Sequence, residues 1–234
     1  MKGIRSMFRC LMIMLFMMVI FALSAYCHDV NGASNKAVSE DVAKVYREKI
    51  ATLEKKYGKY SEEKYEWGMP DQDWIWAKGL SYLQLIDFDK DGQSELFAVW
   101  NNGKEGDFYE FAVYTVKNGK CKRIGHESVG ADGSPAIFWF GISEYNGKPC
   151  VLTSAGITRL AYGYQDKKIK LIFDGFKDTD DKYWNDVEDL TKKTVKRYNL
   201  NGVSDNSMGN EWRMSSFGKK SLKNGIKNTK KILK

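Results

Sequence analysis

The chain has little histidine and little proline, with two histidines and three prolines among 234 residues. Neither an HExxH helix nor a CxxC pair occurs, so the sequence does not indicate a zinc site. The GxSxG and GxxxxGK[ST] patterns are also missing, which leaves no local signature of a serine hydrolase or of a P-loop protein. Paired glycosidase carboxylates leave no local signature, so enzyme activity stays open although a non-enzymatic protein is favoured.

Cysteine is sparse as well. Four are present, and Cys10 lies in the N-terminal segment expected to be removed, which leaves Cys27, Cys121 and Cys150. An odd number in an exported protein argues against a full disulfide framework. Cys121 and Cys150 each follow a predicted turn, and they form either a cross-strand pair or two separate buried thiols.

The N-terminus has the pattern of an export signal. Lys2, Arg5 and Arg9 form a positive region, and an unbroken apolar run from Leu11 to Leu23 follows it. The run is short for a membrane span and suits the core of a signal peptide.

We therefore expect residues 1–25 to be a signal peptide and residues 26–38 to be a flexible linker, which makes the mature protein extracellular or attached to the cell surface. One alternative is an uncleaved N-terminal membrane anchor. A membrane-tethered accessory lipoprotein is a further alternative, with Cys27 as the lipidated residue, but the bulky Tyr26 before it disfavours that cleavage.

The net charge of +7 at pH 7 arises at the two ends of the chain. Residues 217–234 hold seven lysines and no acid, so this Lys-rich tail is basic while the central part is slightly acidic. Apolar or half-polar residues three to four apart predict an amphipathic helix there: Leu222, Ile226, Thr229 and Leu233. The helix either docks on the core with solvated lysines or binds an anionic surface, such as lipid headgroups, teichoic acid or a partner protein. No nucleic-acid partner is expected.

Residues 39–216 are predicted to form one α+β domain. A helix is expected from Ser39, as its cap, to Tyr57, with Gly58 ending it. A β-meander of about eight strands should follow, near 80–87, 94–101, 108–117, 120–127, 136–145, 149–155, 158–165 and 168–174. Asn118-Gly119 and Asn146-Gly147 are strong hairpin turns. The expected architecture is thus a helix packed on an antiparallel sheet with a C-terminal basic helix, and the alternative is a partial β-propeller.

Three further segments are less regular. Residues 59–79 are expected to be an aromatic connection that covers the sheet edge, and the alternative is that Trp74-Ile75-Trp76 presents rings for sugar stacking. A further strand is expected near residues 193–200. Between Asp174 and Asp181, four acidic residues form either a solvated loop or a second cation site, although their spacing lacks the order of a known loop.

The sharpest motif is the run Asp87-Phe88-Asp89-Lys90-Asp91-Gly92-Gln93-Ser94-Glu95. Carboxylates stand at positions one, three, five and nine, and a glycine at position six permits a sharp turn. Carboxylates this close repel one another unless a cation lies between them, and Ca²⁺ prefers about six to eight oxygen ligands. The predicted ligands are the side chains of Asp87, Asp89, Asp91 and Glu95 and the backbone carbonyl of Gln93.

The loop differs from an EF-hand. Position twelve, which requires a bidentate glutamate, is Ala98, and the flanking residues predict strands instead of helices. A strand, a DxDxDGxxE loop and a second strand resemble the calcium loops of integrin-type FG-GAP or VCBS repeats. The resemblance implies the same five ligands, with Glu95 replacing the usual aspartate, but only one good copy of the loop is present.

Over about residues 40–175 the chain also resembles a group of secreted proteins and lipoproteins of Gram-positive anaerobes, and that resemblance implies no activity. We expect an exported, non-enzymatic binding or adhesion protein with one structural Ca²⁺ site, whose partner is a protein or a glycan. The alternative is a secreted hydrolase acting on cell-wall or host glycans.

Overall fold

A computed structural model describes residues 38–66, 73–101, 109–129, 138–155, 158–174, 196–203 and 216–234, and residues 33–234 form one compact unit. The predicted signal peptide and nearly all of the predicted linker lie outside the described residues. Within these ranges the chain forms twelve strands in three sheets and two helices, which confirms the expected β-rich α+β class. No described helix has the length and the apolar character that spanning a membrane requires.

The first large sheet is a four-stranded antiparallel meander of β3 (Leu80–Ile86), β4 (Glu95–Asn101), β5 (Tyr109–Lys117) and β6 (Lys120–Val129). We call it the β3–β6 sheet. Every residue of β4 is buried, because successive side chains point to opposite faces and both faces are covered. Phe97 and Val99 enter one core, whereas Leu96, Ala98 and Trp100 enter another.

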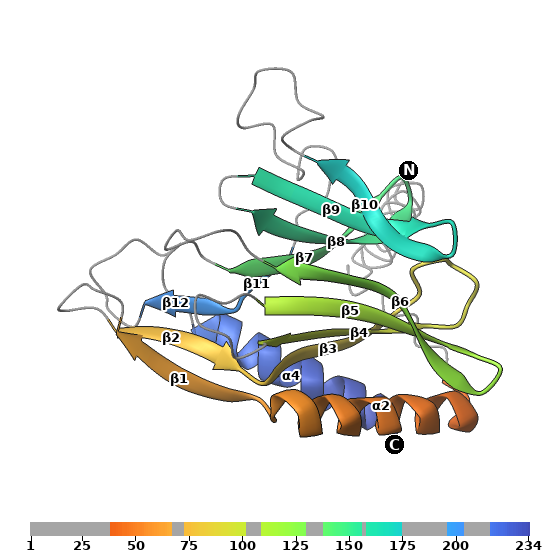
Figure 1. Cartoon of the computed structure of the whole chain (residues 1–234), viewed down its shortest axis with the longest axis horizontal. Coiled ribbons are helices and arrows are strands. Elements are labelled where there is room, and N and C mark those ends of the chain that lie inside the picture. Colours follow the sequence, from red (N-terminus) through yellow and green to blue (C-terminus); the bar gives the residue numbers. More distant parts are fainter. Residues whose placement is uncertain are drawn as a thin grey trace, which may run out of the picture. The chain divides into compact units, whose positions relative to one another are not determined.

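The second large sheet, the β7–β11 sheet, contains five antiparallel strands in the order β10-β9-β8-β7-β11. Their bounds are β7 (Trp139–Tyr145), β8 (Lys148–Ala155), β9 (Thr158–Gln165), β10 (Lys168–Asp174) and β11 (Lys196–Asn199). It stacks face to face on the β3–β6 sheet (Figure 1). Aromatic rings meet across the layer, with centroids 5.5 Å apart for Phe97 and Phe140 and 5.4 Å apart for Phe111 and Tyr162.

The eight strands expected between residues 80 and 174 are thus all present within three residues of their predicted bounds. Their predicted arrangement as one meander is wrong, because they form two meanders in separate sheets. The physical reason is that both meanders carry large aromatic residues on one face, and two stacked sheets bury these faces against each other. The strand expected near residues 193–200 is β11, at the edge of the second sheet.

Helix α2 (Glu40–Tyr57) covers the outer face of the β3–β6 sheet. Its buried side chains are Ala43, Tyr46, Ile50 and Leu53. The Tyr46 hydroxyl lies 3.0 Å from the carbonyl oxygen of Ser94 and 3.2 Å from that of Tyr114, which fixes the helix on the sheet. Gly58 ends the helix as expected, since its N–H donates to the Glu54 carbonyl. Ser39 occupies the N-cap position, but the expected side-chain capping bond is not formed.

The aromatic segment of residues 59–79 was expected to be a connection, and this expectation is wrong. It contains β1 (Ser61–Glu66) and β2 (Asp73–Lys78), which pair with β12 (Asn201–Val203) in a three-stranded sheet. The backbone of β2 finds its second partner in β12, far away in the sequence, which no local pattern reveals. Leu200 connects the sheets, because its carbonyl accepts from Ala77 N–H at 2.8 Å and its N–H donates to Phe138 at 2.8 Å.

The Lys-rich tail forms helix α4 (Ser216–Ile232), which packs along β3. Leu222, Thr229 and Leu233 are buried. The Thr229 hydroxyl donates to the Leu83 carbonyl at 2.9 Å, and Lys230 pairs with Glu54 of α2 at 2.6 Å. The docked alternative for the tail is therefore the one observed, whereas binding to an anionic surface stays a prediction.

Two further expectations concern cysteines and acidic residues. Cys121 on β6 and Cys150 on β8 are free thiols, and burial raises the pKa of Cys150 to about 12. Of the acidic residues between Asp174 and Asp181, only Asp174, at the end of β10, lies within the described ranges.

Candidate metal centre

The turn between β3 and β4 holds all five predicted ligands. Phe88 anchors this turn, because its side chain is fully buried in the aromatic core between the two large sheets. Lys90 and Gly92 have φ angles of 61° and 93°, so the backbone curls twice through the left-handed region within three residues. Glycine is suited to that conformation, as the sequence pattern implies. The turn thereby brings residues from both ends of the motif close together.

Three carboxylates converge at this turn. One oxygen from each of Asp87, Asp89 and Glu95 lies within 4.8 Å of the others. Oxygens that bind a single Ca²⁺ at about 2.3–2.6 Å lie no more than about 5 Å apart, so the spacing suits one shared ion. The Asp87 and Asp89 residues are half-buried, whereas Glu95 is only 2% exposed. This group could hold a metal ion.

Hydrogen bonds orient the converging carboxylates, but one carboxylate oxygen has no donor among the described residues. The Glu95 carboxylate accepts from the backbone N–H of Phe88 at 2.9 Å and from the hydroxyl of Thr115 at 3.4 Å. Asp87 Oδ2 accepts from the Gly92 N–H at 3.0 Å. Asp87 Oδ1 is buried and finds no hydrogen-bond donor in the described part of the chain. A buried carboxylate oxygen without a partner is costly, and a cation would remove that cost.

The other two predicted ligands lie in the same turn with different contacts. Asp91 Oδ1 accepts from the Gln93 backbone N–H at 2.7 Å, and the Gln93 side chain donates to the Val116 carbonyl on β5 at 3.2 Å. These bonds hold the turn against β5. The roles of Asp91 and of the Gln93 carbonyl as ligands stay predictions.

The electrostatics of the turn favour a cation. Burial, followed by the charges of Asp89, Asp91 and Asp87, raises the pKa of Glu95 to about 8. Burial is also the main cause that raises the pKa of Asp89. Among the residues that the structure describes, no lysine or arginine forms an ion pair with Asp87, Asp89 or Glu95. The negative charge of the turn is therefore uncompensated by side chains of the described residues.

Comparison of the chain with protein-family models, with curated proteins and with solved structures found no match. The functional argument consequently depends on the geometry of the turn and of its surroundings.

Sequence reasoning did not identify Tyr164 of β9 or Thr115 of β5. The Tyr164 side chain of the β7–β11 sheet lies near the Asp89 carboxylate in the turn of the β3–β6 sheet, and the two groups influence each other's pKa. The two residues are far apart in the sequence and belong to different sheets, so no local signal marks the contact.

Proposed function

We propose that the protein is an exported, non-enzymatic binding protein whose stacked sheets are stabilised by one structural Ca²⁺ in the β3–β4 turn. The observation that carries the proposal is the buried Asp87 Oδ1 without a donor, beside a Glu95 carboxylate that is almost fully shielded from water. A buried carboxylate oxygen without a donor, next to a second shielded carboxylate, is costly unless a bound cation offsets the desolvation and the repulsion.

The chemistry of the turn favours calcium over other divalent ions. All of the converging groups are oxygens, which disfavours zinc because zinc sites mostly use nitrogen and sulfur ligands. Mg²⁺ demands a near-octahedral shell and keeps several waters, whereas Ca²⁺ accepts a flexible shell of about six to eight oxygens. The turn supplies three carboxylates, with Asp91 and the Gln93 carbonyl nearby. This set of oxygens matches the preference of Ca²⁺.

The proposed fold is a two-layer arrangement with α2 over the outer face of the β3–β6 sheet. Two stacked four-stranded meanders would also suit neighbouring blades of a partial propeller. The position of α2 disfavours the partial propeller, since the helix occupies the outer face of the β3–β6 sheet, on which a further blade would pack. The FG-GAP or VCBS resemblance is accordingly proposed for the calcium loop alone.

The proposal is tested by thermal melts of the wild type and of Asp89→Asn, each in millimolar Ca²⁺, in equal Mg²⁺ and in chelator. At ten times its Kd, Ca²⁺ contributes about 1.4 kcal/mol, which raises the Tm of a domain of this size by about 3–6 °C. We expect this rise in the wild type with calcium alone. In Asp89→Asn the rise should be largely lost, while its Tm in chelator should equal or exceed that of the wild type because repulsion is relieved.

The matched control is Asp166→Asn, which changes an exposed aspartate in the β9–β10 turn that pairs with Lys170 instead. It should keep the full calcium response. A wild-type Tm that is identical in calcium and in chelator would overturn the proposal, as would an equal response in both variants.

A further inference from the structure

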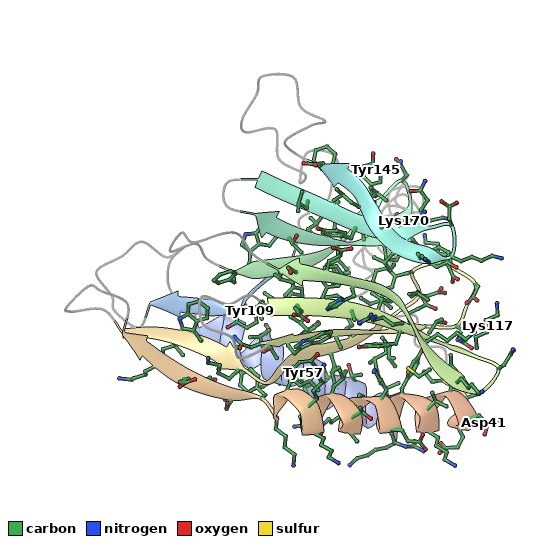
Figure 2. The ribbon with its side chains drawn as sticks, in the orientation of Figure 1. Asp41, Tyr57, Tyr109, Lys117, Tyr145 and Lys170 are labelled. Carbon is green, nitrogen blue, oxygen red and sulfur yellow. The ribbon has the colours of Figure 1, made fainter. Side chains whose placement is uncertain are left out.

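A groove lies where the β7–β8 and β9–β10 turns meet, at one end of the β7–β11 sheet. It has a volume of about 420 Å³, within the range of small-ligand sites. Its walls include Tyr145, Asn146, Lys148, Tyr164, Gln165 and Leu171. We call it the hairpin groove. Figure 2 labels Tyr145 and Lys170 on this sheet.

The lining combines an apolar surface with neutral hydrogen-bonding groups. Leu171 is one of two large hydrophobic residues that are clearly exposed among the described residues, at 42%. Tyr145, which is half-buried, adds an aromatic ring to the lining, and Asn146 and Gln165 are exposed at the two turns. An amide both donates and accepts hydrogen bonds, as a sugar hydroxyl does, and an aromatic ring covers the apolar C–H face of a sugar ring.

The charged residues that line the hairpin groove limit the classes of ligand that it can bind. None of the described residues that line it is acidic, and Lys148 is the only cation among them. A phosphate site would call for several converging donors of positive charge, and a hydrolase of glycans would call for two acids. The lining instead suits a polyhydroxylated ligand that is bound without being cleaved.

The floor of the groove is closely packed. Gly163 pairs with Cys150 of β8, and a Cβ at Gly163 would lie 2.6 Å from Ile172 Cδ1. Ile172 therefore packs directly on the bare backbone of Gly163. A closely packed floor needs little ordering when a ligand binds.

The hairpin groove also touches the candidate metal centre. Tyr164 lines the groove and lies near Asp89, one of the three converging carboxylates. An ion in the turn would therefore change the electrostatic surroundings of Tyr164.

We infer that the hairpin groove binds a carbohydrate chain, with Tyr145 and Leu171 against the sugar face and with Asn146 and Gln165 bonded to its hydroxyls. Its dependence on calcium through Tyr164 rests on the proposed function. According to this inference, the protein is a glycan-binding module, and the hairpin groove is its glycan-binding site.

The experiment is affinity electrophoresis of the full chain in millimolar Ca²⁺ through gels that contain hydroxyethylcellulose, xylan, glucomannan, glycol chitin or polygalacturonate. Retardation by at least one of them is expected. In titration calorimetry with the matching hexasaccharide, Gln165→Ala and Tyr145→Ala should each weaken binding at least tenfold. Tyr60→Ala is the matched control, because it alters a partly exposed tyrosine beside α2, outside the groove, and it should bind as the wild type does.

Melting curves establish that each variant is folded, and Gln165→Ala, at an exposed position, keeps the test valid if Tyr145→Ala unfolds. Retardation by none of the five polysaccharides overturns the inference, and so does unchanged binding by Gln165→Ala and Tyr145→Ala. A calcium-dependent Tm without glycan binding refutes the glycan site alone. Glycan binding that is equal in calcium and in chelator, with no Tm shift, refutes the calcium proposal and leaves the glycan site standing.

Discussion

Glu95 has the most unusual environment of any described acidic residue in the turn. It starts β4, is 2% exposed, and faces three aspartates while two donors bond its oxygens. Local hydrogen bonds favour its charged form, but burial and the neighbouring charges outweigh them and raise its pKa to about 8. A proton and a metal ion therefore compete for the same carboxylate.

This competition predicts a pH dependence in chelator. From about pH 4.5 to about pH 8, the native state keeps a proton on Glu95 that the unfolded chain has lost, so the free energy of unfolding should fall as pH rises. The slope from one such group is at most about 1.4 kcal/mol per pH unit. Calcium replaces the proton, and the gain in Tm on adding calcium should therefore grow across the same window. Urea unfolding in chelator at half-unit pH steps measures the fall in the free energy of unfolding. Thermal melts with and without calcium at the same pH values measure the gain in Tm.

Glu95→Gln is the control for this prediction, since the amide keeps the size of the side chain and does not titrate. In chelator it should lose most of the downward slope between pH 5 and pH 8. An unchanged slope in Glu95→Gln would show that another group titrates.

Gly225 of α4 provides a second prediction at the residue scale. Glycine-to-alanine changes inside helices usually stabilise by about 0.5–1 kcal/mol. Here a Cβ would lie 2.2 Å from Tyr82 Cε2, and Tyr82 is buried among Phe97, Phe140 and Tyr198. We expect Gly225→Ala to destabilise the protein by about 1–3 kcal/mol through overpacking, as measured by urea unfolding.

Asn224→Ala, at the exposed neighbouring position, is the control for this prediction and should be neutral or slightly stabilising. The same result for both variants would contradict close packing of α4 on β3.

At the scale of the elements, α4 closes an edge of the structure. β3 is the edge strand of the β3–β6 sheet, and edge strands expose unpaired backbone groups. Thr229 satisfies the Leu83 carbonyl, Leu222 enters the core between the sheets, and Leu233 joins the core under α2. Lys223 bonds to Glu62 and Lys230 to Glu54, so part of the lysine charge is already neutralised by the docked surface.

Deleting residues 217–234 should therefore destabilise the protein strongly. Loss of the buried leucines alone costs roughly 3–6 kcal/mol, and it leaves the β3 edge open. Calorimetry should show a much lower Tm or no cooperative transition. The control is the double change Lys227→Glu and Lys231→Glu, which alters only exposed charges and should stay within about 0.5 kcal/mol of the wild type. A truncated protein that melts as the wild type does would contradict docking and favour a free tail.

The elements also show what could be predicted from the sequence. Asn118, Gly119, Asn146 and Gly147 all have positive φ, as expected for two-residue hairpin turns, and the strands around them were predicted within three residues. These are local signals, set by the conformational preferences of a few neighbouring residues. The spacing of the β3–β4 turn is equally local, and the structure brings the carboxylates of Asp87, Asp89 and Glu95 within 4.8 Å of one another, while their role as metal ligands stays a prediction.

What could not be predicted depends on contacts distant in the sequence. The division of the strands between two sheets follows from how the aromatic faces of separate meanders meet. The pairing of β2 with β12 joins residues more than a hundred positions apart, and the contact of Tyr164 with Asp89 crosses between sheets. Such contacts leave no periodic or spacing signal in either segment.

At the scale of residues 33–234, the candidate metal centre lies where a bound ion could affect both large sheets. Its three candidate ligands belong to the β3–β6 sheet, Phe88 enters the core between the sheets, and Tyr164 of the β7–β11 sheet lies near Asp89. Binding of an ion at one turn should therefore suppress local opening in both layers, since such opening would separate bonded partners.

Hydrogen exchange with and without calcium tests this coupling. In the wild type, calcium should slow amide exchange at the β3–β4 turn and also along β9, around Tyr164. In Tyr164→Phe the aromatic ring is kept and only the hydroxyl near Asp89 is removed. We expect the calcium effect at the β3–β4 turn to persist in this variant and the effect on β9 to shrink severalfold. If calcium slows β9 equally in both proteins, the sheets communicate through the aromatic core around Phe88, and if it slows β9 in neither, the ion stabilises its own turn alone.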